Sequence, residues 1–200
     1  FTALNRYNKV LEQRNNLLKN RDMSLVYETL PVWDEQLCKY AAVVAAKRTE
    51  FAAMLAPLAM EIHSYLTDGA EVLEISPEKK YKGDEKELSE KLFAELSANY
   101  ERDIRLGFTA SGPHRDDLDI VIDGADAKNF ASQGQMRTAA LSVKLAEVEI
   151  FKKMSGEYPV LILDDVMSEL DLPRRKKLVA RTVGLQTILT CTHAERVLYG

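Results

Sequence analysis

Cysteine, glycine and proline are scarce in this 200-residue sequence, which has two cysteines, nine glycines and six prolines. Cys38 and Cys191 cannot build a disulfide framework, so we expect reduced thiols in a cytoplasmic protein. The low glycine and proline content, together with 46% apolar residues, excludes a disordered or low-complexity chain. Long apolar runs are also lacking: none approaches the ~20 residues that span a bilayer, and no secretory signal opens the sequence. We therefore expect a soluble protein without a membrane partner.

Charge is nearly balanced, with 27 Lys and Arg residues against 31 Asp and Glu residues and a formal net charge of −4. This balance argues against a surface that is basic all over, as many free-standing nucleic-acid-binding proteins have, but it allows a local basic patch. The length suits one full domain or one and a half, which is enough to bury a hydrophobic core.

The first half of the sequence predicts a helical arm. Apolar residues at helical spacing indicate one helix near the N-terminus, and a seven-residue repeat indicates a second helix that packs against it. The repeat consists of Leu37, Val44, Phe51, Leu58 and Tyr65. We expect Pro31 to interrupt the chain before an N-cap at Asp34, and Pro57 to kink or break the repeat helix. With a short strand over 71–76, this arm is predicted to occupy residues 1–104.

From residue 105 the pattern changes to alternating strands and helices. The predicted elements are strands over 105–111 and 118–123, a long buried helix over 133–153, a strand over 158–163, a helix opened by Pro173, a strand over 187–191 and a helix from about Ala194. The continuously apolar run over 158–163 is typical of a parallel strand covered on both faces. This order of elements predicts an α/β fold for residues 105–200.

Two adjacent carboxylates, Asp164 and Asp165, directly follow that apolar run. Ligands of open α/β sheets bind beyond the carboxyl ends of the strands. Asp164 is therefore a candidate ligand for Mg²⁺, which uses one or two carboxylates and retains waters. Asp165 is a candidate for orienting or deprotonating an attacking water. The alternative for the pair alone is an acidic turn or N-cap after a strand.

The long helix opens with Ser132, Gln133, Gly134 and Gln135. Ser132 and Gln135 have the spacing of a capping box, and Gly134 leaves the backbone open to a ligand. Free N–H groups and the positive end of the helix dipole favour a phosphate at such a terminus. A well-capped helix without a ligand is the alternative for this motif by itself.

A histidine, His193, follows the last predicted strand. An imidazole at that place can hydrogen-bond a phosphate or an attacking water. An ordinary polar turn residue is the alternative.

The order of these motifs resembles the C-terminal lobe of an ABC-type ATPase head. In chain order, the match places the signature motif at residues 132–135, the Walker B strand at 160–164, the catalytic carboxylate at Asp165, the D-loop at 168–171 and the switch histidine at His193. The resemblance implies ATP and Mg²⁺ as ligands, with Asp171 of the D-loop near the nucleotide. Most ABC-type ATPases carry Glu where Asp165 stands.

Three segments narrow the resemblance to the RecF family, in the SMC-like branch of these ATPases: residues 112–118, which read GPHRDDL, and residues 131–137 and 163–171. The arm is similar to the second domain of that family, so the resemblance covers essentially the whole chain. It implies an ATP-dependent homodimer that binds DNA, both duplex and single-strand/double-strand junctions at gaps. It also implies work with RecR and RecO and, through them, promotion of RecA loading in recombinational repair. The family commonly has Asp at the position of Asp165.

A Walker A loop is missing from the sequence. That loop needs a Gly-Lys pair followed by Ser or Thr, and no Gly-Lys pair occurs. In the family the loop precedes the arm, so the resemblance implies a fragment that starts at the arm. Such a fragment carries the half of the ATP site that meets the nucleotide bound to the other subunit. We therefore expect no ATPase activity from this chain alone.

Basic residues cluster directly after the D-loop, at Arg174, Arg175, Lys176 and Lys177. They are candidate contacts for the phosphate backbone of DNA. A solvated helix face is the alternative, and the net charge of −4 favours it.

Two further classes of function stay open at this point. A metal-dependent phosphohydrolase would use Asp164, Asp165, Asp171 and His193 as a metal cluster within one chain. A non-catalytic interaction module would use the helical arm to bind a partner. A different SMC-like ATPase would need longer arm helices than the sequence predicts.

Overall fold

The computed structural model describes residues 2–78 and 83–191. Its elements, in chain order, are α1 (Thr2–Leu18), α2 (Met23–Thr67), β1 (Leu73–Pro77), α3 (Glu85–Ala98), α4 (Tyr100–Leu106), β2 (Leu118–Ile122), β3 (Ala125–Asp126), α5 (Ala127–Phe130), α6 (Gln133–Ser155), β4 (Leu161–Asp164), α7 (Val166–Glu169), α8 (Leu172–Arg181) and β5 (Thr187–Thr190). None of these helices is long and apolar enough to cross a membrane.

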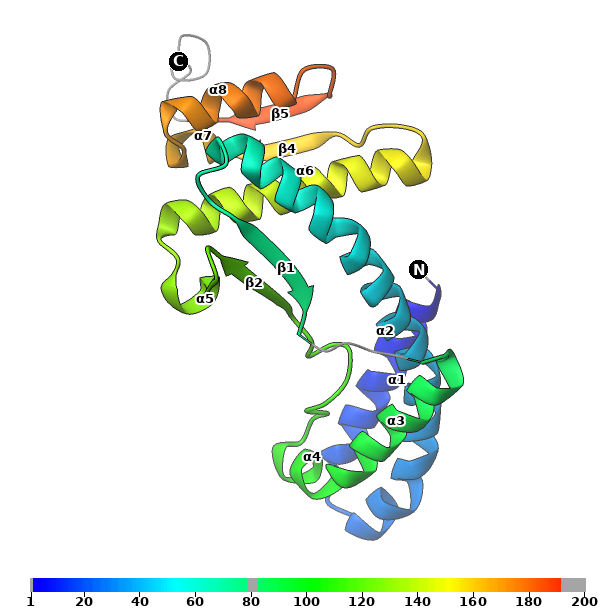
Figure 1. Ribbon diagram of the computed structural model, residues 1–200. Coiled ribbons are helices and arrows are strands. Elements are labelled where there is room, and N and C mark those ends of the chain that lie inside the picture. The colour runs from blue at the N-terminus through cyan, green and yellow to red at the C-terminus, as the bar shows by residue number, and fades with distance from the viewer. Residues whose placement is uncertain (1, 79–82, 192–200) are drawn as a thin grey trace. The chain divides into compact units, whose positions relative to one another are not determined.

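The chain forms two compact units (Figure 1). The first unit combines the described residues up to Phe51 with Pro77–Asp117. The second combines Ala52–Ser76 with the described residues from Leu118 onward. This division differs from the predicted boundary at residue 104, because the C-terminal part of α2 and most of β1 belong to the core around α6, whereas the segment after α4 packs with the helices of the first unit.

The first unit is a small helical cluster. The predicted packing of the first helix against the second is present, and α3 completes the core. Its buried residues are Tyr7, Val10, Leu37, Cys38, Ala41, Ala42, Val44, Leu88, Leu92 and Leu96. A fully buried arginine, Arg14, donates hydrogen bonds to Asp34 of α2, to Asp103 of α4 and to the Thr109 hydroxyl. These contacts tie four separate segments of the unit together.

Helix α2 shows that the predicted interruption at proline is wrong. Its 45 residues run without interruption through Pro31 and Pro57, and Asp34 is an interior residue of the helix instead of its N-cap. Each proline removes a single helical hydrogen bond and is exposed, so its ring meets little packing. Burial of the apolar stripe of α2 outweighs those losses, which the local sequence could not reveal.

The predicted strand over 105–111 is also wrong. Helix α4 extends to Leu106 and ends at Gly107, which has a left-handed backbone (φ 70°) as helix C-caps commonly do. The residues that follow are irregular, and the Asp103 carboxylate accepts a hydrogen bond from the backbone N–H of Ala110. The C-cap at Gly107 and the hydrogen bond from Ala110 to Asp103 thus take the place of the expected strand.

The second unit contains two small sheets packed with helices. The first sheet has the order β1-β2-β3, with β2 antiparallel to β3. In the second sheet β4 and β5 are parallel, as the sequence predicts, with Asp164 opposite Thr190 in the register. Helix α6 contributes buried residues along most of its length to a core that also includes α2, both sheets and α8.

Within the described residues, the strands β4 and β5 are buried on one face only, whereas the sequence predicted burial on both faces for the strand before Asp164. Leu161 and Leu163 are buried, whereas Ile162 is 65% exposed and Ile188 is 50% exposed. The alternation of a strand therefore places apolar side chains on an open face within the described part of the chain.

Candidate functional site

The two aspartates after β4 are organised by one threonine of the neighbouring strand. The Thr190 hydroxyl donates a hydrogen bond to Asp164 Oδ1, and the backbone N–H of Asp165 donates to the Thr190 hydroxyl at 3.0 Å and to the Thr190 carbonyl at 3.2 Å. Both carboxylates are exposed to solvent at the carboxyl end of the parallel pair. Sequence reasoning missed Thr190, although its place at the end of a strand was the available signal.

Asp165 has a left-handed backbone, with φ 50° and ψ 17°, at the start of the short helix α7. Its carbonyl accepts hydrogen bonds from the backbone N–H of Ser168 at 3.2 Å and from the Ser168 hydroxyl at 2.8 Å. The sharp turn therefore fixes the backbone of Asp165 from both sides, while its carboxylate makes no capping bond to α7.

The predicted capping box at the start of α6 is present. The backbone N–H of Gln135 donates to Ser132 Oγ at 3.2 Å, and Gln135 Oε1 accepts from the backbone N–H of Ser132 at 2.9 Å. The next two amides, of Gln133 and Gly134, have no acceptor within the helix because they belong to its first turn. A Cβ on Gly134 would lie 4.0 Å from Arg174 Nη1 and no nearer to any other described atom outside the adjacent backbone of α6, so packing within the described chain does not require glycine there.

The D-loop segment lies beside the first turns of α6. Arg137 Nη2 is 3.2 Å from Glu169 Oε1, and the next predicted residue, Asp171, caps α8 by accepting a hydrogen bond from the backbone N–H of Arg174 at 2.9 Å. In Figure 1 the start of α6, the helix α7 and the carboxyl ends of β4 and β5 lie at one end of the second unit. The structure thus gathers the predicted signature, Walker B and D-loop residues at that end.

His193 lies outside the described residues. Among the described residues, no group of three or more His, Cys, Asp or Glu side chains could hold a metal ion. Asp164, Asp165 and Asp171 therefore do not form by themselves the cluster that a phosphohydrolase acting within one chain requires.

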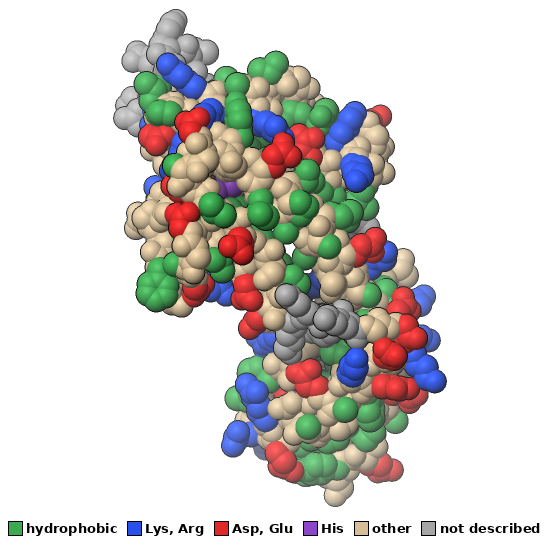
Figure 2. Space-filling model, in the orientation of Figure 1, with side chains coloured by type: hydrophobic (Ala, Val, Ile, Leu, Met, Phe, Trp, Pro, Cys, Tyr) green, Lys and Arg blue, Asp and Glu red, His purple; other side chains and the backbone are tan. Residues whose placement is uncertain are grey.

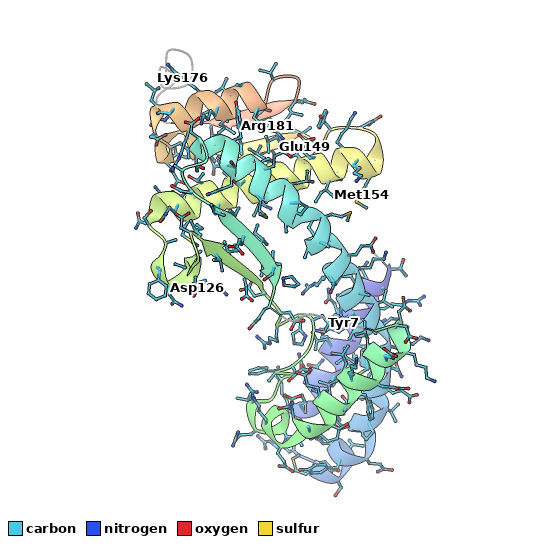
Figure 3. All side chains as sticks on the ribbon, viewed as in Figure 1. Tyr7, Asp126, Glu149, Met154, Lys176 and Arg181 are labelled. Atoms are coloured by element: carbon cyan, nitrogen blue, oxygen red, sulfur yellow. The ribbon has the colours of Figure 1, made fainter. Side chains whose placement is uncertain are left out.

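Most of the predicted DNA-binding run makes contacts within the chain. Arg174 Nη2 is 2.7 Å from Glu71 Oε1, Arg175 Nε donates to the Leu170 carbonyl at 2.8 Å, and Lys177 Nζ is 2.5 Å from Asp68 Oδ1. Lys176, labelled in Figure 3, is exposed on α8. On the face of the second unit shown in Figure 2, basic and acidic side chains are interspersed. The contacts of Arg174, Arg175 and Lys177 within the chain reduce the positive charge that this run can present to a DNA backbone.

The first six residues of the GPHRDDL segment, 112–117, belong to the first unit and are held there by α1 and α2, whereas Leu118 opens β2 of the second unit. Tyr7 Oη is 2.5 Å from His114 Nδ1, Arg48 donates a hydrogen bond to the Pro113 carbonyl, and the Arg115 guanidinium lies 4.8 Å from the centre of the Phe108 ring. These contacts account for the local conformation of the segment through packing within its own unit.

The fold and the order of motifs define the C-terminal lobe of an ABC-type ATPase head joined to a helical arm. Two solved structures that share this fold are of RecF, the recombination mediator of the RecFOR pathway. One is described as RecF with ATPγS and another as RecF with ATP; they match 98% of this chain with TM-scores of 0.81 and 0.80 at 36% identity.

Curated relatives agree with the structural match. RecF of Lachnoclostridium phytofermentans is 46% identical over 190 residues, which is 94% of this chain and 51% of that protein. RecF of Clostridium acetobutylicum is 43% identical over 192 residues, or 96% of this chain and 52% of that protein. No family model matches the chain. The chain spans about half the length of these DNA replication and repair proteins and corresponds to the C-terminal half of RecF.

Proposed function

We propose that this chain supplies the trans-acting half of an ATP site in a RecF-type recombination mediator. In this proposal two subunits dimerise around ATP, and the start of α6 in one subunit meets the terminal phosphates of the nucleotide bound to the other. The observation that carries the proposal is the Ser132 capping box, which leaves the amides of Gln133 and Gly134 without an acceptor in the helix, with Arg174 Nη1 4.0 Å from the place of a Cβ on Gly134.

The chemistry of the helix start suits a polyphosphate. The two free amides add to the positive end of the α6 dipole, and together they favour an anion at this terminus. Gln135 is engaged in the capping box, so its role is to hold Ser132 in place. Asp171, which caps α8 close by, is proposed to approach the same nucleotide from the D-loop.

The aspartates after β4 are proposed to serve the nucleotide of their own subunit. The Asp164 carboxylate and the Thr190 hydroxyl are hard oxygen donors of the kind that Mg²⁺ prefers, and a bound ion would offset charge on the phosphate oxygens. Asp165, exposed and fixed by its backbone, is proposed to orient and deprotonate the attacking water, with His193 as a second polar group. Both aspartates act at the edge where ligands of parallel sheets bind.

DNA binding at gaps, work with RecO and RecR, and promotion of RecA loading are proposed for the longer protein by homology with RecF. Within this chain Lys176 is the strongest candidate of the basic run for contact with DNA, because it is exposed while Arg174, Arg175 and Lys177 are held by other residues. Such contacts would act through the phosphate backbone and weaken with salt.

The experiment is Mg-ATP turnover, with and without duplex DNA, by two proteins. One is this chain alone; the other is a chimera in which the chain replaces the corresponding half of RecF from Lachnoclostridium phytofermentans. We expect turnover only in the chimera, and we expect Asp165→Asn to abolish it. Turnover by the chain alone would contradict the proposal and favour a phosphohydrolase complete within one chain.

Substitution of Ser132 distinguishes an effect on the interaction with nucleotide from an effect on folding. Asp is as good an N-cap as Ser, so Ser132→Asp preserves the helix start but brings a negative charge to the phosphate site. We expect this variant to fold normally and to lose ATP-dependent dimerisation in the chimera. Asp84→Ser, a matched cap exchange on α3, should leave dimerisation unchanged. Unaltered dimerisation of Ser132→Asp would favour a non-catalytic interaction module.

A further inference from the structure

A buried histidine in the second unit stands at the centre of a chain of polar contacts. His63, on α2, has a fully buried side chain. Its Nδ1 lies 3.3 Å from Ser142 Oγ of α6, and its Nε2 lies 3.3 Å from Glu71 Oε2, which precedes β1. Burial lowers the pKa of His63, so the ring is neutral at pH 7. The Glu71 carboxylate faces Nε2, and Nδ1 faces the Ser142 hydroxyl, whose single proton goes to the Thr138 carbonyl.

On one side the contacts continue to the D-loop. The other oxygen of Glu71, Oε1, is 2.7 Å from Arg174 Nη2. Arg174 lies three residues after Asp171, and its backbone N–H is the donor that Asp171 uses to cap α8. The position of the Asp171 carboxylate therefore depends on the same residue that holds Glu71.

On the other side the contacts continue to the start of α6. The Ser142 hydroxyl also lies 2.7 Å from the Thr138 carbonyl, and the Thr138 hydroxyl donates to the Gly134 carbonyl at 2.8 Å. Thr138 and Ser142 are fully buried. Arg174 Nη1 also approaches the place where a Cβ of Gly134 would stand. The chain of contacts thus joins Gly134 to Asp171 through the interior of one unit.

We propose that His63, Glu71 and Arg174 are positioning residues. They hold the start of α6 (residues 132–135) and the D-loop (residues 168–171) in a fixed position relative to each other. We name this set, with Ser142, the polar relay. The inference rests on the proposed function, in which both ends of the relay meet a nucleotide on the other subunit. It assigns Arg174 to this internal role and not to DNA.

A purely stabilising role explains the relay less well. Replacing a buried ion pair by apolar residues of similar volume is often neutral or stabilising, so polar groups in such a place are weak stabilisers. What the relay provides is direction, because the hydrogen bonds of Glu71 with Arg174 and of His63 with Ser142 fix angles that apolar packing does not, and an electrostatic contact at 3.3 Å joins His63 to Glu71. Nucleotide bound across the interface would then meet the signature and D-loop residues already in place, which lowers the ordering cost of dimerisation.

The matched control is a second ion pair between α8 and the end of α2. Lys177 Nζ is 2.5 Å from Asp68 Oδ1, and Lys177 also lies 5.6 Å from the centre of the Tyr65 ring. This pair joins the same helices, and among the described residues Lys177 forms no hydrogen bond or ion pair with α6. Lys177→Gln should therefore loosen α8 without disturbing the start of α6.

The first measurement is amide hydrogen exchange on the chain itself, for Glu71→Gln, Arg174→Gln, the double variant and Lys177→Gln. We expect the amides of Met136 and Arg137 to exchange at least tenfold faster in the first three variants. The exchange rates in the double variant should not exceed those in either single variant. Lys177→Gln should leave them unchanged. Exchange at α6 that stays unchanged in Glu71→Gln, or rises equally in Lys177→Gln, would overturn the relay.

The second measurement is ATP-dependent self-association of the chimera by analytical ultracentrifugation. Glu71→Gln and Arg174→Gln should weaken dimerisation about tenfold without weakening ATP binding to the monomer, whereas Lys177→Gln and Lys176→Gln should not. Equal weakening by all four would overturn a specific positioning role. A wild-type chimera that does not dimerise with ATP would contradict the proposed function, whatever the exchange result at α6.

Discussion

Arg14 Nη1 and Asp103 Oδ2 lie 2.7 Å apart, and both side chains are completely buried. The same guanidinium meets Asp34 at 2.5 Å through Nε, so one cation faces two carboxylates inside the first unit. Removing a buried cation leaves its carboxylates without compensation, which costs far more than the loss of a surface pair.

We expect Arg14→Met to destabilise the first unit by about 3–5 kcal/mol. Urea unfolding followed by the fluorescence of Trp33, the single tryptophan and a residue of that unit, measures the change. Lys47→Met is the control, because Lys47 and Glu50 form an exposed pair that contributes at most about 0.5 kcal/mol. Equal effects of the two substitutions would contradict the importance of burial.

Stability should fall on mild acidification. Burial lowers the pKa values of His63 and His114 below 6.5, so the unfolded chain takes up protons that the folded chain resists. Stability contributed by the neutral rings is present at pH 7 and is lost as pH falls below about 6.5. Melting temperatures between pH 7.5 and 5.5 test this, and the drop should shrink in a His63→Gln/His114→Gln variant. An identical drop in that variant would assign the effect to other groups.

Pro57→Ala should stabilise the second unit by about 1–3 kcal/mol, because it restores a helical hydrogen bond at an exposed position inside α2. Urea unfolding followed by circular dichroism measures the gain, and Met60→Ala at another exposed site of α2 is the control. A loss of stability in Pro57→Ala would mean that the ring makes contacts that outweigh the missing bond.

The backbone of Asp165 predicts an order among substitutions there. Asn adopts the left-handed conformation at least as readily as Asp, whereas Ala and Glu do so at a cost of about 1 kcal/mol. We expect the melting temperature of the chain to be unchanged in Asp165→Asn and lower in Asp165→Ala and Asp165→Glu. A chain in which Asn and Glu are equally tolerated would show that the turn relaxes.

Local signals in the sequence predicted the ends of several elements correctly. The capping box of Ser132 and Gln135 and the parallel pairing of the strand before Asp164 are both present. The capping box depends on residues three positions apart, where spacing and side-chain type decide the conformation, whereas the parallel pairing was indicated by the apolar run before Asp164 and the strand–helix–strand order. The roles proposed for these residues in ATP chemistry stay predictions.

Contacts between distant residues could not be predicted in the same way. Glu71 and Arg174 are 103 positions apart, and Arg14 and Asp103 are 89 apart, so no spacing rule joins them. The same holds for the prolines of α2, where the burial of apolar side chains by the rest of each unit decides against a break.

The left-handed turn at Asp165 also bears on how this position can evolve. A mutation to Glu, the residue that most ABC-type ATPases carry there, meets a conformational penalty before any effect on chemistry. A mutation to Asn keeps the turn and removes only the charge. Divergence at this position is therefore biased: a lineage can abandon the carboxylate without disturbing the fold, whereas lengthening it either costs about 1 kcal/mol or is accompanied by a change in the backbone of the turn.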